Sequence, residues 1–187
     1  MSLEYAILGF LTYGPSTGYD LKRLFDSTVR HFWPADQSQI YRTLNRLGDQ
    51  GFVGHELVEQ DERPDRKIYH LTGEGRAEFL RWLSTPHASD EVREGSLIQV
   101  FFASHLSNQE IIRLAELQAG QIKERLQTLE ALKPLLEEHA SQIGTRRDAF
   151  FWELTLEHGV AMTRAALKWT ESVIRRLKTP GQLPAAR

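Results

Sequence analysis

Turn-forming residues divide this sequence into two parts of different character. Up to about residue 85, segments such as GPSTG, WPADQ, DERPD and TGEG interrupt the chain at short intervals, whereas the part after STPHASD contains few glycines or prolines. Short helices and strands fit between such turns, and long helices fit the uninterrupted part. We therefore expect a mainly α protein with a first domain at residues 1–85, a helical domain at residues 86–178 and a flexible tail at residues 179–187.

Two short helices open the first domain. LEYAILGFL is apolar nearly all round, which predicts a buried helix that ends at Gly14 and Pro15. Thr17 can then accept a hydrogen bond from the backbone of Asp20 and cap the next helix. Ser16 lacks the GxSxG setting of a serine nucleophile, so we interpret it as a turn or cap residue.

A third helix and a hairpin follow. Asp36 and Gln39 have the spacing of a capping box, and Gly51 is placed to end the helix. FVGHELVEQ and RKIYHL are rich in strand-forming residues and flank the turn DERPD, after which Thr72 starts a further helix. Three helices followed by a two-stranded hairpin is the order of a winged helix-turn-helix, whose third helix enters the major groove of DNA.

The third helix has an apolar stripe and an opposite polar face. Ile40, Leu44 and Leu47 recur at helical spacing, so this stripe should be buried. Arginine binds guanine through two hydrogen bonds and asparagine or glutamine binds adenine in the same way, so the polar face could contact base edges. A merely solvated face is the alternative interpretation, but the order of the elements favours DNA contact. The candidate residues on this face are Ser38, Gln39, Arg42, Asn45 and Arg46.

The hairpin, or wing, offers three cations for phosphate contacts, namely Arg63, Arg66 and Lys67. Acidic residues stand among them at positions 61, 62 and 65. Residues 1–85 contain ten Lys plus Arg and twelve Asp plus Glu, a balance of −2 that is unusual for a DNA-binding domain. A winged-helix protein-interaction module without DNA binding is therefore the alternative function.

Other function classes have little support in the sequence. The chain has no cysteine, and its seven histidines show no HxxH or HExxH pairing, so we expect no metal site, no cofactor and no catalytic centre. No apolar run is long enough to cross a membrane, and the N-terminus lacks the pattern of a signal peptide. We expect a cytoplasmic protein that is not an enzyme.

Three segments leave little of residues 3–84 uncovered, namely AILGFLTYGPSTGYDLKRL, SQIYRTLNRLGDQGFV and RKIYHLTGEGRAEFLRWL. In sequence, order and spacing they resemble the PadR family of bacterial transcriptional regulators. SLIQVFFASHLSNQE and FWELTLEHGVAMTRAALKWTESVIRRL are similar to the C-terminal helical domain of longer PadR proteins, which are related to virulence activators.

The resemblance implies a homodimer, usually a repressor, that binds double-stranded DNA and is released by a small aromatic or lipophilic effector. Tyr41 lies where family members also carry an aromatic residue, so both a phosphate contact and core packing are open for its side chain. Aromatic residues of the second domain could form an effector pocket, although core packing is the simpler explanation. These residues are Phe101, Phe102, Phe150, Phe151, Trp152 and Trp169.

Two long apolar stripes mark the second domain independently of any resemblance. One lies within residues 122–136 and the other within residues 151–173, both at steps of three and four. Packing inside one chain could cover one stripe, and a second subunit is the natural cover for the other, with a monomeric helical hairpin as the alternative. Pro134 should kink or split the first of these helices near Lys133.

Overall fold

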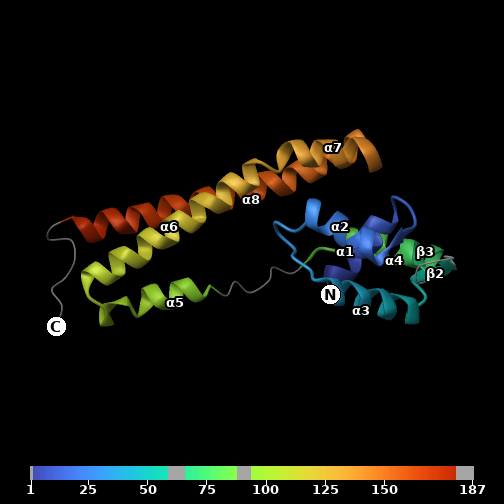
Figure 1. Cartoon of the computed structure of the whole chain (residues 1–187), viewed down its shortest axis with the longest axis horizontal. Coiled ribbons are helices and arrows are strands. Elements are labelled where there is room, and N and C mark those ends of the chain that lie inside the picture. Colours follow the sequence, from blue (N-terminus) through green and yellow to red (C-terminus); the bar gives the residue numbers. More distant parts are fainter. Residues whose placement is uncertain (1, 59–65, 88–93, 180–187) are drawn as a thin grey trace. The chain divides into compact units, whose positions relative to one another are not determined.

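The computed structural model describes residues 2–58, 66–87 and 94–179, and helices account for most of them (Figure 1). This confirms the expected mainly α fold class. None of the described helices is long and apolar enough to cross a membrane.

The chain forms two compact units. The first contains residues 1–88 and 135–152, and the second contains residues 89–134 and 153–187. The domain boundary after residue 85 stays a prediction.

The first unit contains a winged helix-turn-helix. Three helices share one core, a three-stranded antiparallel sheet of order β1-β3-β2 carries the wing, and a fourth helix follows it. The predicted order of helices and hairpin is thus confirmed. The elements are α1 (Ser2–Leu11), β1 (Ser16–Thr17), α2 (Gly18–Ser27), α3 (Gln37–Asp49), β2 (Val53–Val58), β3 (Arg66–Leu71) and α4 (Gly73–Leu83).

Strand β1 corrects the sequence prediction, which placed only a turn or cap at this point. Ser16 pairs with Tyr69 and Thr17 pairs with Ile68, so β3 is the central strand of the sheet. A strand of two residues has no alternation that a sequence pattern could reveal, because its pairing depends on a partner fifty residues away. Thr17 still caps α2 as predicted.

The apolar stripe of α3 is buried as expected. Ile40, Leu44 and Leu47 are at most 1% exposed and belong to the same core as Ile7 of α1 and Leu21 of α2. Each such side chain contributes about 1.5–3 kcal/mol when fully buried. Because this stripe fixes the rotation of α3 about its own axis, the opposite polar face must point to solvent.

Side-chain caps set the beginnings of these helices. The Asp36 carboxylate accepts from the backbone N–H of Gln39 at 2.7 Å, and the Gln39 side-chain oxygen accepts from the backbone N–H of Asp36 at 2.9 Å. The Thr72 hydroxyl accepts from the N–H of Gly75 at 3.0 Å and donates to the carbonyl of Gly51 at 2.7 Å. Gly51, with φ +75°, ends the turn after α3. The predicted caps are therefore present.

Longer helices follow the winged helix-turn-helix. Pro134 is the second residue of α7, where the missing N–H costs no intrahelical hydrogen bond, and the predicted kink or split is a full break between α6 and α7. The elements are α5 (Gly95–Phe101), a short 3₁₀ helix η1 (Ala103–His105), α6 (Asn108–Glu130), α7 (Lys133–Ile143) and α8 (Arg146–Lys178).

In the second unit, α6 and α8 run side by side in opposite directions (Figure 1). Three ion pairs at seven-residue intervals link them: Glu116 to Lys178, Lys123 to Glu171 and Glu130 to Arg164. All six side chains are about half exposed, so each pair contributes little stability by itself, about 0–1 kcal/mol. Their seven-residue spacing follows the register in which the two helices lie side by side.

Only part of the two predicted apolar stripes is buried. In the stripe within residues 122–136, Leu129 and Leu136 are buried. In α8 the buried residues are instead Leu156, Thr163 and Thr170, at seven-residue spacing. Most of the stripe predicted within residues 151–173 faces solvent in the single chain; its exposed members include Phe151, Leu154, Met162 and Trp169.

Candidate DNA-binding interface

The polar face of α3 is exposed along its whole length. We call it the outer face of α3, and its central residues are Ser38, Arg42 and Asn45. All three side chains lie opposite the buried stripe and are open to solvent. The capping box holds the first turn of α3 rigid, because it satisfies two N–H groups that would otherwise lack partners.

The two arginines of α3 have different surroundings. The Nε atom of Arg46 lies 2.7 Å from a carboxylate oxygen of Glu4 on α1, whose side chain is only 13% exposed. Arg42 forms no ion pair with the described part of the chain, and its guanidinium faces solvent. Arg42 is therefore available to a base edge without the loss of an existing contact, whereas Arg46 would first have to leave Glu4.

Gln39 also has a local role. Its side-chain oxygen is engaged in the capping box with Asp36, which leaves its amide NH₂ group to donate elsewhere. The cap fixes the orientation of this oxygen, so Gln39 is less free than its neighbours to turn towards an adenine. Of the five predicted residues of this face, Ser38, Arg42 and Asn45 are thus the freest to contact DNA.

Tyr41 lies on the flank of α3 against the start of α2. A Cβ atom added at Gly18 would stand 2.5 Å from Cε1 of the Tyr41 ring, so only glycine permits this approach. Burial raises the pKa of the nearby Tyr69 hydroxyl, and Tyr41 adds to that rise. The Tyr41 ring is therefore positioned by Gly18 while the side chain stays more than one third exposed.

Two of the three predicted phosphate-binding cations of the wing, Arg66 and Lys67, belong to the described residues. Arg66 lies 3.7 Å from Asp20 at the start of α2, which makes it a partner of that helix. Lys67 is exposed and lies on the opposite face of the strand, because neighbouring residues of a strand alternate. Arg63 lies outside the described residues.

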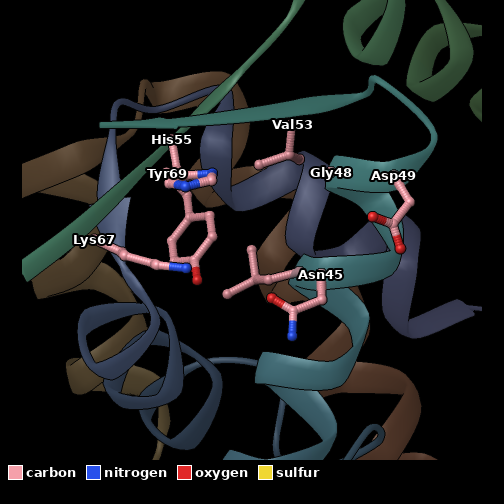
Figure 2. Close-up of a pocket in the computed structure, with 8 residues that line it drawn as sticks. Asn45, Gly48, Asp49, Val53, His55, Lys67 and Tyr69 are labelled. Carbon is pink, nitrogen blue, oxygen red and sulfur yellow. The ribbon is translucent and has the colours of Figure 1, made fainter. Parts of the chain in front are cut away.

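A pocket of about 310 Å³ separates α3 from the wing, and we call it the α3–wing pocket (Figure 2). Figure 2 shows His55, Tyr69 and Lys67 on its strand side and Asn45 and Asp49 on its helix side. Leu44, Gly48 and Val53 complete the lining.

His55 lines the pocket although no sequence motif indicated a role for it. The sequence pattern that could have indicated it is the alternation of side chains along β2, which places His55 on the same face as buried Val53. The register pairs His55 with Tyr69, and their ring centroids are 5.9 Å apart. Without that register, the sequence could not show that His55 faces α3.

The aromatic residues proposed for an effector pocket are divided between the two units, with Phe150, Phe151 and Trp152 in the first and the others in the second. Phe101 and Phe102 contact each other edge to face and are both mostly exposed, and Phe150 contacts Phe151 in the same manner. Trp152 is half-buried and meets Tyr13 edge to face within the first unit. Trp169 follows Trp152 along α8 by almost five helical turns, about 3.6 residues each.

Comparison with known proteins places this fold. The Transcriptional regulator PadR-like family matches residues 7–81, and the Virulence activator alpha C-term family matches residues 92–178. The curated Negative transcriptional regulator PadR of Bacillus subtilis is 31% identical over 173 residues, which are 92% of this chain and 95% of that protein. The chain belongs to the PadR-like family. The resemblance identified in the sequence is thereby confirmed.

Solved PadR structures support the same assignment over nearly the whole chain. Bacillus subtilis PadR in complex with operator DNA has a TM-score of 0.81 at 29% identity, covering 95% of this PadR-like chain and 100% of that one. Bacillus subtilis PadR in complex with p-coumaric acid has a TM-score of 0.77 at 28% identity, covering 96% and 100%. Both the winged helix-turn-helix and the long C-terminal helices are thus features that this chain shares with PadR.

Proposed function

We propose that this PadR-like chain is a sequence-specific DNA-binding repressor. The observation that carries the proposal is the outer face of α3, where Ser38, Arg42 and Asn45 stand exposed on a capped, well-packed helix beside a wing. Such a helix fits the major groove, where arginine and asparagine distinguish guanine and adenine. The ion pair of Arg46 with Glu4 makes Arg42 the principal candidate for a base contact.

The similar proteins support DNA binding and repression. The curated relative from Bacillus subtilis is named as a negative regulator, and a structure of that PadR contains operator DNA. The excess of acidic residues in residues 1–85 does not prevent such binding, because the outer face of α3 between Asp36 and Asp49 contains no carboxylate.

The proposed active form is a homodimer. The exposed stripe of α8, with Met162 at 60% and Trp169 at 40% exposure, is large and apolar for a surface helix. No residue of the short helix α5 is buried either, although Ile98 and Phe101 are large apolar residues. A second copy that covers these surfaces would place two α3 helices on one DNA duplex, and twofold symmetry then calls for an inverted repeat.

A small aromatic molecule is the proposed effector. One structure of the Bacillus subtilis relative contains p-coumaric acid, a molecule of this class. For this chain we propose that an aromatic ligand lowers operator affinity, with Trp152 and its neighbours Phe151 and Tyr13 as the first candidates for contact. Titration of p-coumaric acid against the bound complex would show whether that compound acts here.

Selection of bound duplexes from a random pool tests the proposal directly. The full-length chain should enrich a sequence with dyad symmetry, whose half-sites lie about 10 base pairs or a multiple apart on one side of the duplex. Enrichment of asymmetric sites would contradict the dimeric arrangement. Failure to retain any duplex at low salt would favour a winged-helix protein-interaction module instead, for which the acidic balance of residues 1–85 provides a reason.

A further inference from the structure

We propose that the α3–wing pocket seats one phosphate of the DNA backbone, held by Lys67 and His55. This inference rests on the proposed DNA binding and adds to it a defined contact between protein and backbone. It also gives His55 a role that the sequence did not indicate.

The pocket lies between the two elements that would contact the DNA. One wall is α3, which would occupy the major groove, and the other wall is the inner face of the wing, which would lie along the adjacent minor groove. A sugar-phosphate strand separates the two grooves of a duplex. A strand must therefore cross the concavity between α3 and the wing when both are engaged.

Two side chains of the strand wall, Lys67 and His55, can bind a phosphate. Lys67 and Tyr69 lie on one face of β3 because they are two residues apart, and His55 stands opposite Tyr69 on β2. The Tyr69 ring is buried and packs beside the imidazole of His55. Lys67 and His55 are both exposed and form no ion pair with the described residues, so a phosphate would not have to displace a partner.

The helix wall adds one donor and one negative charge. The Asn45 amide can donate to a phosphate oxygen from the side opposite the wing. Asp49, one turn further along α3, faces the same space and offsets the charge of Lys67. Since these two charges oppose each other, the seat also depends on the hydrogen bond that the His55 imidazole can donate to a phosphate oxygen.

The test uses the duplex selected by the full-length chain and binding by fluorescence anisotropy at several salt concentrations. We expect Lys67→Gln to bind about tenfold more weakly, with a salt slope lower by about 0.9 per contact, hence about 1.8 for the dimer. His55→Gln should also bind about tenfold more weakly, because a donor to the phosphate is lost. Asp49→Asn should bind about threefold more tightly, because a repulsive charge is removed. His70→Gln is the matched control, since His70 lies on the opposite face of β3.

A second arm locates the phosphate. Methylphosphonate is placed at one backbone position at a time in the selected duplex, which removes a single charge. At the position of the phosphate that occupies the pocket, methylphosphonate should weaken binding by the wild type. It should cause little additional loss in His55→Gln and Lys67→Gln, because these variants already lack the same interaction. Thermal melts of each variant establish that weaker binding does not come from unfolding.

The outcomes separate this inference from the proposed function. If the wild type binds no duplex, the proposed function fails and the inference fails with it. If the wild type binds its selected duplex but His55→Gln and Lys67→Gln keep its affinity and salt slope, only the phosphate seat is overturned. Saturable binding of inorganic phosphate that needs His55, with no response to methylphosphonate, would assign the pocket to a free phosphate and overturn the DNA contact.

Discussion

The Nε atom of Arg46 lies 2.7 Å from a carboxylate oxygen of Glu4, so α1 restrains one of the two arginines of α3. Arg42, one turn earlier on the same helix, has no such partner among the described residues. Arg46 therefore stabilises the packing of α1 on α3, whereas Arg42 is free to contact DNA. Sequence spacing alone assigned the same role to both.

Arg42→Ala should weaken binding to the selected operator by about 1–3 kcal/mol and relax base preference at one symmetric pair of positions. Arg46→Ala should cost less binding energy, because its guanidinium already has a partner in Glu4. Anisotropy titrations on the operator and on single-base variants measure both effects. Equal losses of affinity and specificity for the two variants would contradict this division.

A double-mutant cycle with Glu4→Gln and Arg46→Ala measures the pair itself. The coupling in the free energy of unfolding should be about 0.5–1 kcal/mol, since Arg46 is more than half exposed while Glu4 is mostly buried. Urea unfolding of the four proteins gives this number. Zero coupling would mean that the contact does not hold α1 to α3.

Gly18→Ala should displace the Tyr41 ring, because the new Cβ would lie 2.5 Å from its Cε1 atom. If the Tyr41 hydroxyl binds a backbone phosphate, Gly18→Ala and Tyr41→Phe should weaken DNA binding by a similar amount, roughly 1.5 kcal/mol. Gly120→Ala is the control, since a Cβ there meets nothing within 4 Å. Normal binding by Tyr41→Phe would assign Tyr41 to packing alone.

The dimer prediction concerns the exposed stripe of α8. Light scattering should give the mass of two chains for the wild type, and Met162→Glu should shift it towards one chain because a charge would enter an apolar interface. Lys168→Glu, at another exposed position of α8, should leave the mass unchanged. A wild-type monomer at micromolar concentration would exclude the dimer.

Asp148 makes stability depend on pH near the start of α8. Its carboxylate accepts from the backbone N–H and the hydroxyl of Thr145, and these hydrogen bonds lower the pKa of Asp148 below its usual range. A lowered folded-state pKa adds stability above the unfolded value, about 3.9, and that stability is lost as the pH falls through the folded value. The wild type should exceed Asp148→Asn in unfolding free energy at pH 6, and the gap should shrink below about pH 4.

Urea unfolding across this range measures the gap. Glu137→Gln, at an exposed position of α7, is the control for a general loss of negative charge. A gap that stays constant down to pH 3 would mean that the Asp148 charge does not contribute to folding.

Local patterns in the sequence determined the elements of the winged helix-turn-helix. The capping box of Asp36 and Gln39, the cap at Thr72 and the stripe of Ile40, Leu44 and Leu47 all depend on residues within a few turns of each other. Such short-range signals fix where a helix begins and which face it buries. The outer face of α3 is therefore predictable from the sequence alone.

Tertiary structure decided which of those exposed residues are free. Three relationships join residues from different elements. Arg46 pairs with Glu4, Tyr41 lies against Gly18, and His55 faces α3. Strand β1 and the break before α7 were likewise settled by the packed chain. Contacts of this kind depend on how elements pack in three dimensions, and local sequence patterns do not record that packing.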